Sequence, residues 1–123
     1  MSLAYEIDED ERLIVITGDY SDAAEWRSLL GRVLADPRRQ PGFAFLRDLR
    51  LAAKPVDADT VVQIMDVVRR FWPQLQPSRA AIVTKQNEDP AALVAHALAD
   101  AQQLPMRAFN SYDEALAWLK GDL

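Results

Sequence analysis

The 123 residues, half of them apolar and 27% charged, have the size and composition of one folded domain spanning residues 1–123. The net charge is −5 at pH 7 and the arginines are scattered among acids, so nucleic-acid binding is not expected. The lack of cysteine excludes disulfides, thiolate metal sites and cysteine nucleophiles. Without a signal-peptide pattern or an apolar run of about 20 residues, we expect a soluble, cytoplasmic protein that does not insert into membranes.

The first third of the chain predicts two strands and a helix. Apolar and polar residues alternate over residues 3–8, as in a half-buried strand, and an acidic turn then leads into the β-branched run 13–16. We expect these two strands to form a hairpin. A helix is expected to begin near Ser21 or Asp22, where Glu25 completes a capping-box pattern, and to end at Pro37.

The central strand is expected within residues 42–50. It is rich in aromatic and apolar residues, and the charged pair Arg47 and Asp48 indicates where the chain leaves the core. Two shorter apolar runs, residues 80–83 and 106–109, predict further buried strands.

Helices are expected between these strands. Asp57 or Asp59 caps the second helix, and Pro73 and Pro77 are expected to end it. Its apolar residues are Val61, Ile64, Met65, Val68 and Trp72. The third helix is expected to open around residues 88–90, with a proline in its first turn. Its apolar face is predicted to consist of Leu93, Val94, Ala97, Leu98 and Ala101.

The last helix is expected to begin at Ser111, because Ser111 and Glu114 form a complete capping box. Its apolar residues are Ala115, Leu116 and Leu119, with Trp118 covering its edge. The order of elements is therefore ββαβαβαβα. Because strands that alternate with helices form parallel crossovers, we expect an α/β fold: a five-stranded, mixed, mostly parallel sheet with four helices.

Two short motifs add a resemblance to a known family. The central strand ends in Asp48-Leu49, and the last helix carries Glu-Ala-Leu-Ala-Trp-Leu at residues 114–119. With the order of elements, these motifs resemble the STAS-like, anti-sigma-factor-antagonist superfamily, and more closely an uncharacterised bacterial branch of it. The resemblance implies a STAS-like fold and a non-enzymatic interaction module in a bacterial cytoplasm, which binds a protein partner or a second copy of itself.

The resemblance also directs attention to one hydroxyl group. In partner-switching members of that superfamily, a phosphorylatable Ser or Thr begins the helix that follows the central strand. Thr60 is the only hydroxyl residue in the corresponding segment, residues 55–60. Because Asp57 and Asp59 would repel a phosphate there, we interpret Thr60 as a structural first-turn residue and not as a phosphosite.

Ligands of open α/β sheets bind beyond the carboxyl ends of the parallel strands. The candidate ligand- or partner-binding residues expected at that edge are Asp48, Arg50, Thr84, Lys85, Asn87 and Asn110. Asp48 is flanked by Arg47 and Arg50, whose charges favour an ionised carboxylate suited to an ion pair or a loop anchor. Trp72, near the end of the second helix, is a further candidate, either as a partner anchor or as a cap on the core.

Catalytic, metal and cofactor sites are not indicated. The single histidine, His96, lies in the middle of a helix, and the chain has no glycine-rich phosphate loop. The leading hypothesis is therefore the interaction module. The alternative is a small-molecule or lipid carrier, or a cryptic enzyme, that uses the polar edge of the sheet. It requires a concave apolar pocket around Asp48, Thr84 and Lys85.

Overall fold

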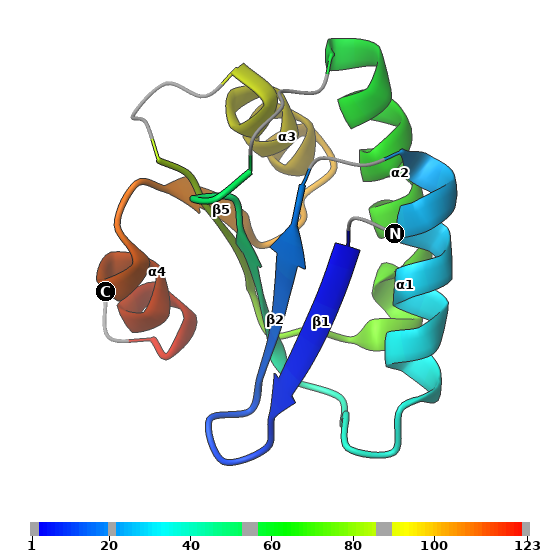
Figure 1. Cartoon of the computed structure of the whole chain (residues 1–123), viewed down its shortest axis with the longest axis vertical. Coiled ribbons are helices and arrows are strands. Elements are labelled where there is room, and N and C mark those ends of the chain that lie inside the picture. Colours follow the sequence, from blue (N-terminus) through cyan, green and yellow to red (C-terminus); the bar gives the residue numbers. More distant parts are fainter. Residues whose placement is uncertain (1–2, 20–21, 53–56, 86–89, 122–123) are drawn as a thin grey trace.

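The computed structural model describes residues 3–19, 22–52, 57–85 and 90–121. Its strands are β1 (Leu3–Asp8), β2 (Leu13–Gly18), β3 (Ala44–Asp48), β4 (Ala80–Val83) and β5 (Met106–Phe109). Its helices are α1 (Ala23–Ala35), α2 (Ala58–Leu75), α3 (Pro90–Ala101) and α4 (Tyr112–Leu119). These elements confirm the predicted ββαβαβαβα order and the α/β class (Figure 1).

The strands lie side by side in sequence order, β1-β2-β3-β4-β5. β1 runs antiparallel to β2, and the other neighbouring strands are parallel, so the sheet is mixed as predicted. Each parallel crossover steps in the same direction across the sheet. Because such crossovers are right-handed, α1, α2 and α3 all fall on one face. After β5 the chain places α4 on the opposite face (Figure 1).

Each face of the sheet therefore has its own core. On the face under α1, α2 and α3, the largest contributions come from Ile14, Ile16, Trp26, Leu29, Leu30, Val33, Phe45, Leu49 and Met65. On the face under α4, the core consists of Leu13, Ala44, Leu46, Ala81, Val83, Ala115 and Leu119. β2, β3 and β4 contribute to both cores, as expected for strands that are covered on both sides.

Three helices begin with the side-chain caps that the sequence predicts. Asp22, Asp57 and Ser111 each accept a hydrogen bond from the backbone N–H three residues later, at distances of 2.9, 2.7 and 3.3 Å. Each bond satisfies one of the N–H groups that the first helical turn leaves without an internal partner. Of the two aspartates considered for α2, Asp57 is the cap.

The prediction that Pro73 ends α2 was wrong. The helix continues to Leu75 and ends at Gln76, a left-handed residue with a φ of 47°. The N–H of Gln76 donates to the carbonyl of Trp72 at 2.9 Å. Proline removes one N–H donor from the helix, but the helix continues because the buried Leu75 packs its last turn into the core.

The predicted apolar face of α3 was correct only in part. Val94 and Leu98 pack against the core, but the buried residues of the helix are three alanines, Ala92, Ala95 and Ala99, and Leu93 is 53% exposed. Alanines are buried here because α3 packs beside α2 and along β5. The small side chain of alanine allows the backbone of α3 to lie close to these elements. The start of α3 predicted at residues 88 and 89 lies outside the described residues, and the described helix begins at Pro90.

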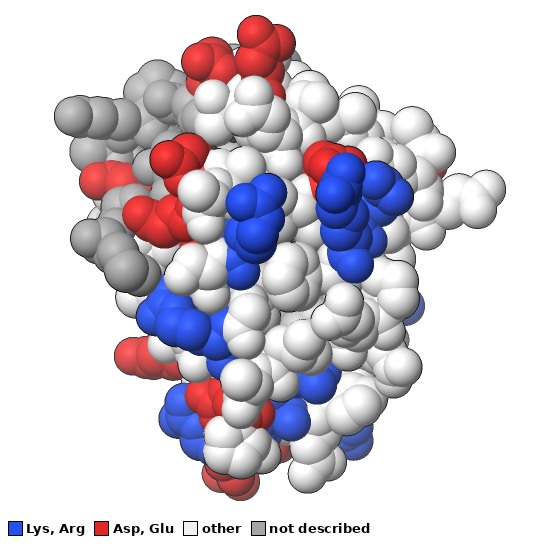
Figure 2. All heavy atoms as spheres, turned by 90° about the vertical axis from the view of Figure 1, so that its right-hand side faces the viewer, with Lys and Arg blue, Asp and Glu red and all other residues white. Residues whose placement is uncertain are grey.

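The outer surface of α1 and α2 carries charges of both signs, with uncharged areas between them (Figure 2). On α2, Arg69 and Arg70 each form an ion pair with Asp66, at 2.8 and 3.0 Å. All three side chains are well exposed, so these pairs contribute little to stability.

Candidate functional site

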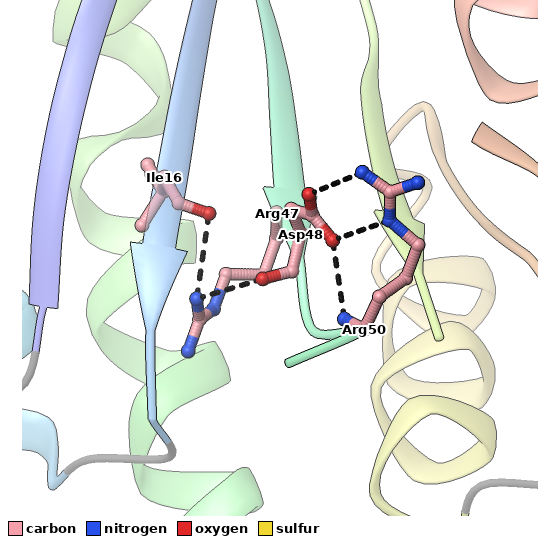
Figure 3. A network of polar contacts seen from close by, with 4 residues as sticks. All are labelled: Ile16, Arg47, Asp48 and Arg50. Carbon is pink, nitrogen blue, oxygen red and sulfur yellow. Dashed lines mark hydrogen bonds and ion pairs between the residues drawn. The ribbon is translucent and has the colours of Figure 1, made fainter. Parts of the chain in front are cut away.

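Successive residues of β3 belong to different faces of the sheet. Phe45 and Leu49 join the core under α1, α2 and α3, whereas Leu46 joins the core under α4. Between them, Arg47 extends toward β2 and Asp48 extends toward Arg50 (Figure 3). Arg47 also donates to the backbone carbonyl of Asp48 at 3.5 Å, whereas the Asp48 carboxylate pairs with Arg50.

An apolar cavity of about 120 Å³ lies between α2 and the sheet. Its walls include Ile16, Trp26, Leu30, Phe45, Arg47, Leu49, Val61, Ile64, Met65, Val68, Trp72, Leu75, Ala80, Ile82, Ala92, Ala95 and Met106. Protein interiors hold few voids larger than a water molecule, so a space of this size is a distinct feature of the fold. We call it the α2 cavity.

Small side chains explain why the α2 cavity is there. α2 packs between α1 and α3. Beneath it, β4 presents Ala80, and α3 presents Ala92 and Ala95. These three methyl groups are too short to fill the volume between the helix layer and the sheet. Ile64, on α2, is only half-buried, so the cavity borders the protein surface beside that helix.

Of the described residues that line the α2 cavity, only Arg47 is charged. Its Nη2 donates to the carbonyl of Asp19 at 2.9 Å, and its Nη1 donates to the carbonyls of Ile16 and Asp48 at 3.4 and 3.5 Å. The guanidinium also lies 5.6 Å from the ring centre of Trp26. Arg47 is 8% exposed. A buried charge needs such polar partners, and arginine does not lose its proton at neutral pH.

The prediction that the chain leaves the core at Arg47 and Asp48 was wrong. Arg47 is buried within β3, and Leu49, one residue beyond the strand, is still only 8% exposed. The alternation along β3 places Arg47 between Phe45 and Leu49 on the cavity side. A charge inside an otherwise apolar run was the signal in the sequence that could have identified Arg47 as a buried residue.

Asp48 and Arg50 form an ion pair at the end of β3. The carboxylate lies 2.8 Å from Nη2 of Arg50 and also accepts the Arg50 backbone N–H at 3.1 Å (Figure 3). These hydrogen bonds from Arg50 lower the pKa of Asp48, and they raise the pKa of Arg50. The guanidinium of Arg50 lies 4.4 Å from the ring centre of Tyr112. Together these contacts fasten the turn after β3 to the start of α4.

The other described residues predicted at this edge follow the ends of β4 and β5, which are neighbouring strands. Thr84 is buried, and its hydroxyl donates to the carbonyl of Phe109 at 3.5 Å. Lys85 and Asn110 are exposed at the ends of β4 and β5. Asn87 lies outside the described residues. The α2 cavity is not lined by Asp48, Thr84 or Lys85, so it lies elsewhere than the pocket that the carrier hypothesis placed among them.

Trp72 and Thr60 both lie on α2. Trp72 is half-buried, packs against the core and lines the α2 cavity. Thr60 donates its backbone N–H to the carboxylate of Asp57, and hydrogen bonds from Thr60 to Asp57 lower the pKa of that carboxyl. Thr60 thus takes part in capping α2.

A second hollow, of about 410 Å³, lies at the opposite end of the strands. It is bordered by the β1–β2 hairpin, the start of β3 and the end of α4. Across its rim, Lys120 pairs with Glu11 at 2.9 Å. Both side chains are about half exposed, so this hollow is open and solvated.

His96 approaches Asp100 at 3.4 Å on the same helix. Within the described ranges, no group of three or more His, Cys, Asp or Glu side chains is arranged to hold a metal ion. None of the helices in the described part of the chain has both the length and the apolar character needed to cross a bilayer.

A search of protein-family models found no match to this chain, and searches of curated proteins and of solved structures found no similar protein. The family resemblance described above therefore stays a prediction, and function has to be argued from the geometry.

Proposed function

We propose that this chain is a STAS-like, non-enzymatic binding domain that holds a small apolar molecule in the α2 cavity. The observation that supports the proposal is the cavity itself: about 120 Å³ with an almost wholly apolar lining. An engineered apolar cavity of about 150 Å³ stays dry and binds benzene or xenon. The α2 cavity is comparable in volume but borders the protein surface, so its expected occupant is a single ring or a short branched or linear chain.

The lining favours binding over catalysis. The only charged residue among the described lining residues is Arg47, which cannot exchange its proton near neutral pH. The apolar walls can supply roughly 25 cal/mol for each Å² of ligand surface removed from water. For a ligand of benzene size, less the cost of association, we expect a Kd on the order of 0.1–1 mM.

The test is a titration with toluene, followed by NMR of the cavity methyl groups. The wild type is compared with Ala95→Leu, which places three more carbons in the cavity. Ala97→Leu is the matched control, because Ala97 lies on the same helix but is exposed. We expect toluene to shift the methyl signals of Ile16, Met65 and Val68 in the wild type and in Ala97→Leu, but not in Ala95→Leu. Equal shifts in all three proteins, or none in the wild type, would contradict the proposal.

Contact with a protein partner is a second candidate, favoured by a different observation. Leu51, Val62 and Leu93 are 93%, 49% and 53% exposed. They follow β3 or lie near the first turns of α2 and α3, and therefore belong to the carboxyl edge of the parallel sheet. Large exposed apolar side chains at one edge can belong to an interaction surface.

The first partner to test is a second copy of the chain. Sedimentation velocity of the wild type is compared with the double variant Leu51→Ser, Leu93→Ser. A concentration-dependent dimer that disappears in the variant would support the second candidate. An identical monomer in both samples would count against self-association through this edge.

A further inference from the structure

β1 is an edge strand, and the described elements of the chain leave one of its sides open (Figure 1). It pairs with β2 on the other side, and α1 packs against one of its faces. Its register with β2 is continuous from Leu3 to Asp8, without a bulge, and the strand contains no proline. Every second residue of an edge strand presents its backbone N–H and carbonyl groups to the open side, where another strand can pair with them.

The opposite edge of the sheet, β5, is less suited to pairing. β5 has four residues, follows Pro105 and carries the exposed Arg107. Short strands, prolines and charges are common means by which proteins prevent one sheet from pairing with another. β5 also packs against both α3 and α4. β1 is longer, at six residues, so it is the edge better suited to accept another strand.

The sequence of β1 complements itself in one register. When two copies pair around a two-fold axis perpendicular to the sheet, the antiparallel register is centred on one residue. A centre at Glu6 would set two glutamates opposite each other, and a centre at Ile7 would set Glu6 opposite Asp8. Like charges directly opposite each other are destabilising. A centre at Tyr5 sets each Glu6 opposite Ala4 of the other copy, whereas a centre at Ala4 pairs fewer residues of the strand.

We infer that the protein forms a two-fold dimer in which β1 pairs with β1 of a second copy, centred on Tyr5, so that two five-stranded sheets become one. Tyr5 and Ile7 are half-buried in the single chain. In the dimer, Tyr5 and Leu3 of the second copy would cover them on the α1 face. This gain of apolar and aromatic contact adds to the backbone hydrogen bonds of the new strand pair.

Tyr5 is already held in place for this contact. Its hydroxyl donates to the carboxylate of Asp36 at 3.0 Å, and the guanidinium of Arg32 lies 5.9 Å from its ring centre. The ring therefore has little freedom to lose when the second copy binds. The N–H of Leu3 donates to Glu25 at 3.1 Å, so we expect the new hydrogen bonds to form around Tyr5 and not at the first residue of the strand.

Sedimentation equilibrium of charge variants tests the dimer. Two short strands bury less than a standard interface of about 1,600 Å², so the dimer is expected to be weak and is measured up to about 1 mM protein. Ala4 is exposed, and Ala4→Glu places a like charge opposite Glu6 twice in each dimer. We expect its dissociation constant to rise about three- to tenfold, and that of Ala4→Lys to fall by a similar factor.

Ala97→Glu and Ala97→Lys are the matched controls. Ala97 is exposed on α3, away from β1, and the two substitutions change the net charge of the protein by the same amounts as those at Ala4. We expect both controls to dimerise within about twofold of the wild type. The double variant Leu51→Ser, Leu93→Ser should also keep this dimer, because neither residue belongs to β1.

Cross-linking through introduced cysteines tests the register, because the chain has none of its own. In the double variant Ala4→Cys, Glu6→Cys, the thiol at position 4 faces the thiol at position 6 of the second copy. The Cα atoms of residues directly opposite each other are about 4.5–5.5 Å apart, within the range of a disulfide. We expect mild oxidation to link this variant into a covalent dimer. Glu6→Cys alone should stay unlinked, because its two thiols are diagonal across the strand pair.

The possible results each decide the inference, which does not depend on the α2 cavity. A weak dimer that responds to charge at position 4 but not at position 97, and that cross-links in the double cysteine variant, would support it. A monomer at every concentration, or equal dissociation constants for Ala4→Glu and Ala4→Lys, would overturn it. Cross-linking of Glu6→Cys alone as fast as the double variant would overturn the register centred on Tyr5.

Discussion

The two faces of the sheet differ in the kind of space that they leave between helix and sheet. Three helices of 12–18 residues cover one face, yet they leave a cavity of about 120 Å³ beneath α2. A single helix of 8 residues covers the other face, and Leu46, Val83 and Ala115 beneath it are entirely buried. The hollow of about 410 Å³ on that side lies at the end of the strands, and a solvated ion pair crosses its rim. The apolar space therefore lies beneath α2, and the space beside α4 is open to solvent.

Arginine also has a different role on each face. On the α4 side, Arg50 stacks on Tyr112 and Arg79 stacks on Trp118, so these arginines cover the edge of the core. On the other side, Arg47 lies inside the core and lines a space. This contrast supports a binding role for the α2 side and a structural role for the α4 side.

The largest expected effect is the loss of a fully buried side chain from the core under α4. Leu46→Ala should lower the free energy of unfolding by about 2–5 kcal/mol, because it leaves a void that its neighbours cannot close. Urea denaturation measures this change. Val62→Ala, on the exposed side of α2, serves as the control and should change stability by less than about 0.5 kcal/mol. A small effect of Leu46→Ala would mean that the α4 side is not tightly packed.

A smaller effect is expected from adding volume at two buried alanines of α3. Ala99 is 0% exposed and does not line the cavity, so Ala99→Leu should cost about 1–3 kcal/mol through overpacking. Ala95 lines the cavity, so Ala95→Leu should be neutral or stabilising by the same denaturation measurement. Equal destabilisation by both substitutions would show that neighbouring side chains fill the space beneath α2 in solution.

The smallest effect concerns the ion pair of Asp48 with Arg50. Because hydrogen bonds from Arg50 lower the pKa of Asp48, this group stabilises the fold above its unfolded pKa, about 3.9, and loses that contribution as the pH falls through the lower folded pKa. Asp48→Asn should therefore cost less than about 1 kcal/mol at neutral pH.

The pH dependence of that cost provides the check. The difference in unfolding free energy between the wild type and Asp48→Asn should shrink steadily in acid. Arg50→Met should reduce the same pH-dependent contribution, because it removes the partner that lowers the pKa. A difference that is constant with pH would show that the ion pair is not what stabilises the end of β3.

The sequence predicted where helices and strands lie better than it predicted which of their residues face the core. Caps at Asp22 and Ser111 located helix starts, and alternation or apolar runs located the strands, because both signals act within a few residues. The inward face of α3 was predicted only in part, since the burial of Ala95 and Ala99 depends on the distance between two helices. That distance depends on contacts far apart in the sequence.

The candidate site was less predictable for the same reason. The polar residues at the carboxyl edge could be inferred from the topology, and the structure places Asp48 and Arg50 in contact there. The α2 cavity could not be inferred, because it arises where Ala80 of β4 and Ala95 of α3 meet beneath a third element. The sequence predicts only an electrostatic role for Arg47 beside Asp48. The alternation of Phe45, Arg47 and Leu49 nevertheless indicated that Arg47 lies on the cavity side of the sheet.

The central claim is that the space beneath α2 is a real apolar binding cavity, and the most direct test is a crystal structure determined under xenon pressure. Xenon binds apolar cavities of this size without needing a matched functional group. The account predicts a xenon atom between α2 and the sheet, in contact with Phe45, Met65 and Ala95, and no xenon at that position in Ala95→Leu. Side chains that fill the space, or xenon bound only elsewhere, would contradict it.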